Sequence, residues 1–258
     1  MGLSKLSRSI DGSIALITGA ASGMGRETAR LFADEGARLA LLDINTEKLG
    51  EVAGEIRAAG KEVISITVDL ADRDAVGEAV QSAVEQLGGL DILVNNAGLI
   101  LPAEIDGVGY ANSWDTSFAV MTTAQAWAIR AALPALRRAA HPRVVNLAST
   151  EALGATRFAS GYTVAKHASV GLTRAMAVDL GDEGITVNCV CPGPSHTAIT
   201  ADMADAEKQV FANRRTALRR YGEPEEVAQA ILSLVLPAAS YITGATLVVD
   251  GGLSIRNA

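Results

Sequence analysis

The sequence predicts an α/β fold in which helices flank a doubly wound parallel sheet of about seven strands. Two observations support this prediction. Short apolar runs alternate with helix-like stretches, and the runs are apolar on both faces, as strands are when helices cover both sides of a parallel sheet. The chain is also 49% hydrophobic but only 4% aromatic, which suits a core of small and branched aliphatic side chains.

The elements are expected in strict alternation. Gly36 and Gly60 follow two of the helices, at the position where a glycine commonly ends one. Pro134 is expected to bend or divide the longest helix because proline cannot donate the helical hydrogen bond, and residues 192–220 are expected to be less regular. The strands are expected at 13–18, 37–43, 62–69, 90–95, 143–148, 185–191 and 246–249, and the helices at 26–35, 46–59, 72–87, 113–140, 161–181 and 225–236.

Charge and hydropathy argue against two classes of partner. The formal net charge is −7, and basic residues gather only in pairs such as Arg137 and Arg138, so no nucleic-acid partner is expected. No stretch approaches the roughly 20 continuous apolar residues that cross a bilayer. The chain start also lacks an apolar segment followed by a small-residue cleavage site. We therefore expect a cytoplasmic protein without a membrane partner.

The cysteines and histidines do not form a metal-binding pattern. Cys189 and Cys191 alternate in a strand-like run, where extended backbone points both side chains to one face. Buried, reduced thiols are expected because cysteine is among the most buried residue types. His141, His167 and His196 lie near no second ligand at a spacing that metals use, so no metal site is expected.

A glycine-rich loop over residues 18–25 follows the first expected strand and precedes the first expected helix. Glycines let the backbone approach a ligand closely, and the free N–H groups at a helix start favour a pyrophosphate. An ordinary strand-to-helix turn explains the glycines equally well when the loop is considered by itself. With the strand and helix around it, the loop predicts nucleotide contacts at Gly19, Ser22, Gly23, Met24 and Gly25.

Asp43 closes the second expected strand, 18 residues after Gly25. A carboxylate there accepts hydrogen bonds from the adenosine ribose hydroxyls and repels a 2′-phosphate, and neither Ile44 nor Ser22 supplies a cation for such a phosphate. The sequence therefore favours NAD over NADP, with Asp43 and Ile44 at the cofactor. The alternative is that Asp43 only caps the next helix, a position that Asn45 or Thr46 is also able to fill.

Further motifs follow the loop in a fixed order. Asp69 ends the third expected strand, Ser149 follows the fifth, and Tyr162 precedes Lys166 by four residues. The remaining motifs are Asn95-Asn96-Ala97-Gly98, Pro192-Gly193, Tyr241-Ile242-Thr243-Gly244 and Val249-Asp250-Gly251-Gly252. With these motifs, the chain from about Gly12 to Gly252 resembles the compact type of the short-chain dehydrogenase/reductase family.

This resemblance implies a Rossmann-type fold and one domain over residues 1–258. The nucleotide-binding half would lie at about 12–110 and the catalytic and substrate half at about 111–252. The implied activity is NAD-dependent interconversion of a secondary alcohol and a ketone by hydride transfer. The resemblance also implies a homotetramer that forms through the helices at 113–140 and 161–181 and through the last strand.

The resemblance implies three catalytic residues. Tyr162 and Lys166 share one face of a helix, where an ammonium near a phenol lowers its pKa of about 10 toward neutrality, so Tyr162 is the expected general acid/base. Ser149 would hydrogen-bond the substrate oxygen, and Lys166 would bind the nicotinamide ribose. The further cofactor contacts implied are Tyr162, Asp69, Leu70, Asn96, Ala97, Gly98, Pro192, Gly193 and Thr197, although turn-forming preference explains each loop residue singly.

Met121 departs from the family pattern, which has an asparagine here that holds a water near the lysine. A thioether does not orient a water as an amide does. Ser117 and Thr122 are hypothetical substitutes. The departure leaves open a catalytically impaired NAD(H)-binding sensor or scaffold, and an enzyme of the same fold that performs epimerisation or dehydration is a third possibility.

The substrate loops are expected at residues 99–107, 151–158 and 194–215. Leu99, Ile100, Leu101, Leu153 and Phe158 lie in them and favour an apolar small-molecule substrate, such as a steroid-like alcohol or a 3-oxoacyl thioester. The same residues also suit simple packing. The segment 194–215 is long enough to close over substrate as a lid.

Overall fold

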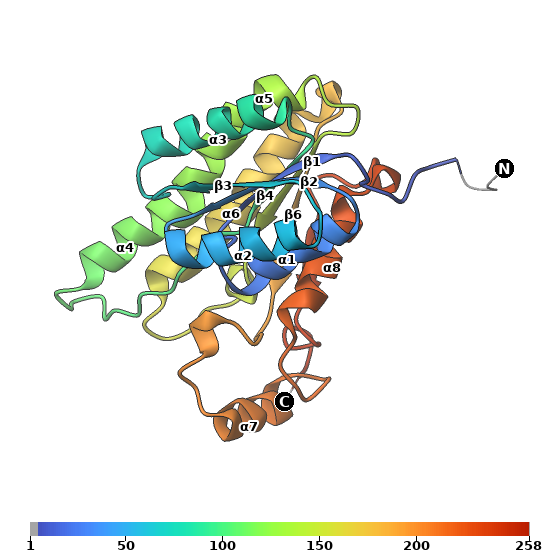
Figure 1. The fold of residues 1–258 in the computed structure, drawn as a ribbon. Coiled ribbons are helices and arrows are strands. Elements are labelled where there is room, and N and C mark those ends of the chain that lie inside the picture. Colours follow the sequence, from blue (N-terminus) through green and yellow to red (C-terminus); the bar gives the residue numbers. More distant parts are fainter. Residues whose placement is uncertain (1–4, 258) are drawn as a thin grey trace.

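The computed structural model describes residues 5–257 and contains a single seven-stranded parallel sheet (Figure 1). The single domain expected over 1–258 includes residues 1–4 and 258, which lie outside the described residues. The strand order is β3-β2-β1-β4-β5-β6-β7, so the predicted doubly wound fold is confirmed. The strands are β1 Ile14–Thr18, β2 Arg38–Asp43, β3 Val63–Thr67, β4 Ile92–Asn95, β5 Arg143–Leu147, β6 Thr186–Pro192 and β7 Thr246–Val249.

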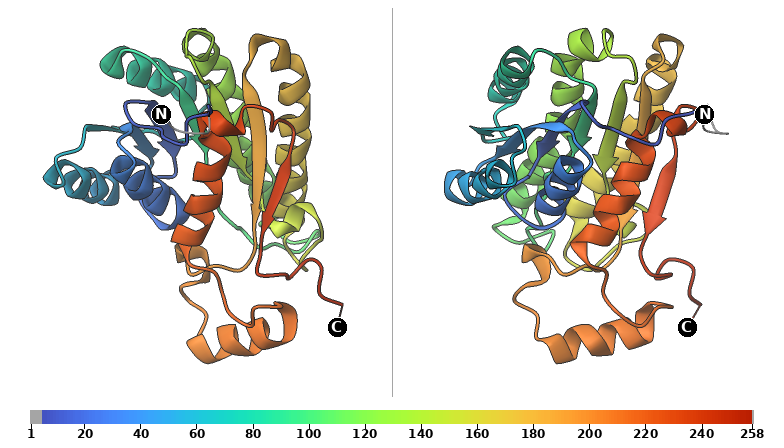
Figure 2. Two further views of the ribbon diagram at one scale, coloured as in Figure 1. Left: turned by 90° about the vertical axis from the view of Figure 1, so that its right-hand side faces the viewer. Right: turned by 45° about the vertical axis from the view of Figure 1, so that its right-hand side comes forward.

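Helices cover both faces of this sheet. The apolar residues of α1, α2 and α8 form the core on one face, and those of α3, α5 and α6 form the core on the other. Helix α8 packs against α1, and α7 lies apart from the sheet (Figure 2). The helices are α1 Gly23–Asp34, α2 Thr46–Ala58, α3 Arg73–Leu87, α4 Tyr110–Phe118, α5 Ala124–Leu136, α6 Ser160–Asp179, α7 Asp205–Arg215 and α8 Pro224–Val235.

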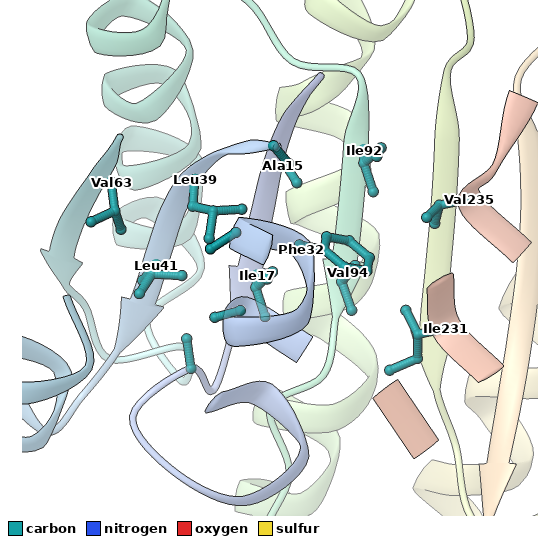
Figure 3. Packing of buried hydrophobic residues seen from close by; sticks show 14 of the residues in the cluster. Ala15, Ile17, Phe32, Leu39, Leu41, Val63, Ile92, Val94, Ile231 and Val235 are labelled. Carbon is teal, nitrogen blue, oxygen red and sulfur yellow. The ribbon is translucent and has the colours of Figure 1, made fainter. Parts of the chain in front are cut away.

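The core of the first face is aliphatic except for Phe32. Figure 3 shows this ring beside Ile17 of β1 and Val94 of β4, with Ile231 of α8 nearby. Phe32 and Ile17 are fully buried, and each buried apolar side chain of this size contributes about 2 kcal/mol to folding. The packing holds α1 over the centre of the sheet, where its N-terminus faces the carboxyl ends of β1 and β4.

The chain reverses direction across the sheet between β1 and β4. After β1 it builds β2 and β3 on one side, and then it crosses to β4 and continues through β7 on the other. Loops that leave the carboxyl ends of β1 and β4 therefore diverge, and ligands of open α/β sheets bind in the crevice between such loops.

Several predicted element boundaries are wrong. The third strand ends at Thr67 rather than at residue 69, because Thr67 pairs with Asp43, where β2 ends. The first helix begins at Gly23 rather than at residue 26, so the last glycines of the loop form its first turn. The seventh strand is confirmed at Thr246–Val249.

The helix expected over 113–140 consists of three parts. Helix α4 ends at Phe118, a π-helical turn (η1) spans Ala119–Thr123, and α5 follows. Pro134 does not divide it, because this proline lies near the end of α5. The π turn is fixed from outside, since Ser169 Oγ of α6 donates to Met121 O at 3.0 Å. Such turns are frequent at functional sites.

The region 192–220 is more regular than expected. It contains a 3₁₀ turn at Ala198–Thr200 and the helix α7. Lys208 and Ala212 are the buried residues of α7, so little of its sequence signals a helix face. In Figure 2 this helix lies below the edge at which β6 ends.

Candidate active site

A cleft of about 430 Å³ lies at the carboxyl ends of the strands. It is lined by every residue that the sequence predicts for catalysis or cofactor binding except Gly25. The predicted residues that line it are Gly19, Ser22, Gly23, Met24, Asp43, Ile44, Asp69, Leu70, Asn96, Ala97, Gly98, Ser149, Tyr162, Lys166, Pro192, Gly193 and Thr197.

The glycine-rich loop forms one wall of the cleft. Gly19 has a φ of +66°, and a Cβ on it would lie 2.7 Å from the Cα of Ala97, so a side chain is excluded on two grounds. The Asn96 side chain fixes the loop by donating to Thr18 O at 2.9 Å and to Gly19 O at 3.1 Å. Ser22 is the N-cap of α1, and its side chain caps no backbone N–H. The helix start is thus available to an anion.

Gly25 is buried behind this wall and has a packing role. A Cβ on Gly25 would overlap Gly19 O and would lie 2.5 Å from Asn96 Nδ2. The predicted cofactor contact at Gly25 is therefore not part of the cleft lining. Gly25 is needed because α1 approaches the loop closely at this position. The spacing of glycines in the sequence does not distinguish such packing from contact with a ligand.

Asp43 ends β2 at the cleft. Its Oδ2 accepts from Ala21 N at 3.0 Å, and its Oδ1 accepts from Asn45 N at 2.9 Å. Asn45 is the N-cap of α2, since its side chain accepts from Lys48 N. The capping alternative for Asp43 is therefore wrong. Each carboxylate oxygen has further lone pairs for a ligand hydroxyl.

Ser149, Tyr162 and Lys166 converge from two elements. Ser149 follows β5, and its Oγ accepts from Glu151 N at 3.1 Å. Tyr162 and Lys166 lie one turn apart on α6, with Lys166 Nζ 5.6 Å from the centre of the Tyr162 ring. Lys166 is almost completely buried and donates to Leu147 O at 2.8 Å.

Burial dominates the acid–base properties of this group. It raises the pKa of Tyr162, while a hydrogen bond from Ser149 lowers that pKa and the charges of Glu151 and Cys191 raise it. The expected shift of Tyr162 toward neutrality is therefore wrong for the protein by itself, because desolvation of the phenolate outweighs the favourable contacts. Burial also lowers the pKa of Lys166 to about 8.

Sequence comparison covers nearly the whole chain. The family model described as enoyl-(acyl carrier protein) reductase matches residues 19–254. A subunit of (2S)-[(R)-hydroxy(phenyl)methyl]succinyl-CoA dehydrogenase from Thauera aromatica is 36% identical over 246 residues, 95% of this chain and 98% of the relative. The chain belongs to the short-chain dehydrogenase/reductase family. This confirms the family expected from the motifs.

Two further relatives of this short-chain dehydrogenase/reductase are similar over almost their full length. Cyclohexanol dehydrogenase from Acinetobacter sp. is 35% identical over 251 residues, 97% of this chain and 98% of the relative. The crystal structure of L-sorbose reductase from Gluconobacter frateurii, complexed with NADPH and L-sorbose, is similar with a TM-score of 0.90 and 28% identity, covering 97% and 99%. The protein is an oxidoreductase of the class that acts on CH–OH groups.

In this short-chain dehydrogenase/reductase, Met121 stands where the family pattern has an asparagine. The side chain is fully buried next to Lys166: a Cβ on Gly98 would lie 3.3 Å from Lys166 Nζ and 3.6 Å from Met121 Sδ. Thr122 Oγ1 donates to Ala165 O at 3.3 Å. The buried hydroxyl of Ser117 has no hydrogen-bond partner within residues 5–257. Whether either one substitutes for the asparagine stays a prediction.

Sequence reasoning missed part of the cleft lining. Some of these residues end strands or directly follow them, which was a usable signal, because every parallel strand delivers its last residues to the same edge. The residues not predicted for the site are Val68, Val120, Leu147 and Ala148. Leu99, Pro194, Ser195, Ala198, Ile199 and Thr200 also line the cleft, and they lie in the segments 99–107 and 194–215 that were expected to contact substrate.

The part of the chain that the structure describes also bears on the expectations about a membrane span, a metal site and the cysteines. No helix there is long and apolar enough to span a membrane. No group of three or more His, Cys, Asp or Glu residues gathers there as a metal site would require. Cys189 and Cys191 are buried free thiols, which confirms that prediction.

Proposed function

We propose that the protein is an NAD-dependent oxidoreductase that interconverts a secondary alcohol and a ketone. The observation that carries this proposal is the convergence of Ser149, Tyr162 and Lys166 in the cleft whose wall is the glycine-rich loop. The loop suits a dinucleotide, since Gly19 excludes a side chain and the start of α1 offers free N–H groups.

Each of the three residues has one task in this proposal. Bound NAD supplies the hydride acceptor, and NADH supplies the donor. Tyr162 takes the hydroxyl proton of the alcohol during oxidation and returns it to the ketone oxygen during reduction. Ser149 donates to the substrate oxygen and stabilises the negative charge that develops there. Lys166 would hold the nicotinamide ribose, and its ammonium favours the phenolate form of Tyr162.

The preference for NAD depends on Asp43. Its carboxylate would accept from the adenosine ribose hydroxyls and repel a 2′-phosphate. Ile44 is 64% exposed beside it and offers no positive charge. The L-sorbose reductase structure holds NADPH, so cofactor choice does not follow from family membership.

The double variant Asp43→Ser, Ile44→Arg is expected to change cofactor choice. We expect the ratio of kcat/KM with NAD to kcat/KM with NADP to fall about 100-fold, since the ribose contacts are lost and a phosphate partner is gained. Absorbance of the reduced nicotinamide measures both rates. Asp74→Ser is the control, because this exposed carboxylate in the first turn of α3 is not part of the cleft lining. Equal use of NAD and NADP by the unmodified protein would contradict the proposal.

An apolar substrate fits the exposed side chains of the loops around the cleft. Ile199 in the cleft lining is 52% exposed, and Leu153, Phe158 and Met203 are also exposed. Such side chains suit a steroid-like alcohol or a 3-oxoacyl thioester. Closure of residues 194–215 over the substrate is part of the proposal and would cover these side chains.

The experiment that tests the reaction class offers secondary alcohols with NAD and ketones with NADH while absorbance is followed. Turnover of any pair supports the proposal. Tight NADH binding without turnover across the panel favours the sensor or scaffold that Met121 suggested. Product formation without a net absorbance change would instead indicate epimerisation or dehydration.

The assembly is proposed from the family resemblance. A homotetramer would form through α4, α5, α6 and the last strand. Val178 of α6 is 82% exposed, as an interface side chain would be in the separate chain. Sedimentation of the full chain at several concentrations distinguishes a tetramer from a monomer.

A further inference from the structure

Glu151 lies between the segments that carry Ser149 and Tyr162. It is the middle residue of the 3₁₀ turn η2 (Thr150–Ala152), which directly follows Ser149. Its backbone N–H donates to Ser149 Oγ at 3.1 Å. Its carboxylate Oε2 accepts from Thr163 Oγ1 at 2.9 Å, and Thr163 is the neighbour of Tyr162 on α6. Glu151 therefore connects the end of β5 with the start of α6.

The same carboxylate holds the loop between these two elements. Residues 153–158 are exposed, so little packing fixes them. Thr156 Oγ1 donates to Glu151 Oε1 at 2.7 Å, in addition to the bond from Thr163. Each carboxylate oxygen thus receives one hydroxyl hydrogen, and the two bonds span the loop from its start to the first turn of α6. The loop is therefore held by one side chain rather than by packing.

The bond from Glu151 also orients the serine hydroxyl. An N–H group only donates, so Ser149 Oγ is the acceptor of this bond, and the hydroxyl hydrogen of Ser149 stays available for another oxygen. Burial raises the pKa of Tyr162, and a hydrogen bond from Ser149 partly offsets this. The 3₁₀ turn thus presents the Ser149 hydroxyl as a donor toward Tyr162.

The charge of Glu151 acts on Tyr162 without a compensating cation. No salt bridge among residues 5–257 includes Glu151, and its side chain is only partly exposed. Burial raises the pKa of Tyr162, and the charge of Glu151 raises it further. The other titratable groups at Tyr162 are Lys166 on the same helix and Cys191 on β6. Helix α4 and the π turn pack against α6 and contribute uncharged residues there, namely Ser113, Trp114, Ser117 and Met121.

We propose that Glu151 is a positioning residue for proton transfer, which fixes the Ser149 hydroxyl relative to the start of α6 and places a negative charge beside the phenol of Tyr162. The inference rests on the proposed function for its catalytic meaning. A carboxylate near a phenol favours the neutral phenol, which is the form that protonates a ketone oxygen. Glu151 therefore favours ketone reduction at neutral pH and moves alcohol oxidation to higher pH.

Glu151→Gln tests the charge, because it keeps the length of the side chain and one acceptor oxygen. Oxidation requires the phenolate form, so its rate falls below the pKa of Tyr162. Without the carboxylate this pKa decreases, and we expect the acid limb of the pH–rate profile for oxidation to move about one unit to lower pH. On that limb, oxidation becomes about tenfold faster. Glu85→Gln, which changes an exposed glutamate of α3, is the matched control and should leave the limb unmoved.

NMR of the full-length protein, labelled with ¹³C at the tyrosine Cζ, follows the same ionisation without substrate. Tyr162→Phe identifies the Tyr162 signal among the four tyrosines of the chain. At a fixed pH of about 10.5, the phenolate fraction of Tyr162 should be several-fold larger in Glu151→Gln than in the unmodified protein. Glu151→Met, which is also uncharged and of similar length, takes its place if thermal unfolding shows that Glu151→Gln is not folded.

Thr163→Val tests the connection between the two segments, since it keeps the shape of the side chain and removes the hydroxyl. We expect kcat on the plateau of the pH profile to fall about tenfold with little change in the Kd of NADH, because Ser149 and Tyr162 lose their fixed relative position. Thr163→Ser should restore kcat. Adding Thr163→Val to Glu151→Ala should cost nothing further, since both changes break the same bond. Additive losses overturn the inference.

The role of Glu151 and the proposed function fail in different ways. Turnover with an unmoved acid limb and an unmoved Tyr162 titration in the folded, uncharged variants overturns the role of Glu151 alone. A moved titration in a protein that turns over no alcohol or ketone overturns the proposed function and leaves the action of Glu151 on Tyr162 in place. An unmoved titration without turnover overturns both.

Discussion

Tyr162→Phe is expected to lose turnover by about a thousandfold while NADH binding changes little. The variant removes only the hydroxyl that would exchange a proton with the substrate oxygen. The ring stays, and so does the packing around it. Steady-state kcat with the best alcohol or ketone of the panel measures the loss, and the quenching of protein fluorescence by NADH measures binding.

Tyr241→Phe is the matched control for this result. Tyr241 is fully exposed far from β5 in sequence and is not part of the cleft lining, so the same chemical change should leave kcat unaltered. A Tyr162→Phe variant that retained more than about a tenth of the activity would assign the proton transfer to another group.

Gly25→Ala is expected to destabilise the protein by about 3 kcal/mol and to weaken NADH binding with it. The added methyl group would overlap Gly19 O and approach Asn96 Nδ2, so the loop and α1 must separate. For a chain of this length the change corresponds to a fall of roughly 10 °C in Tm. Chemical denaturation, followed by circular dichroism, gives the free energy directly.

Gly77→Ala tests the same substitution where space is available. Apart from its chain neighbours and the backbone of its own helix, no heavy atom of residues 5–257 lies within 4 Å of a Cβ on Gly77, which is inside α3. Alanine should therefore stabilise the protein by about 0.5–1 kcal/mol through the lower backbone entropy of the unfolded chain. If both variants had the same stability, crowding at Gly25 would not explain the need for glycine there.

Most of the fold was predictable because its signals are local. Alternating apolar runs and helical stretches specify a parallel sheet, and Gly36 and Gly60 mark helix ends. The π turn was not predictable, since the bond from Ser169 to Met121 O joins residues that are 48 positions apart. Helix α7 was missed because it buries little apolar surface.

The site residues, too, were predictable where their signal is local and not predictable where it depends on packing between distant segments. The ends of parallel strands meet at one edge, so Ser149, Asp43 and the loops after β4 and β6 were expected to lie together. Gly25 was assigned to the ligand because spacing alone does not show whether a glycine faces a phosphate or a neighbouring turn.

The hydrogen bonds around the glycine-rich loop affect how tightly a dinucleotide binds. Asn96 fixes Thr18 O and Gly19 O, and the Asp43 carboxylate holds Ala21 N. The loop is thus preorganised by the protein's own side chains. Ordering it costs the binding reaction little conformational entropy, and more of the contact energy is retained as affinity. Calorimetry of an Asn96 variant should show this as a less favourable entropy of association.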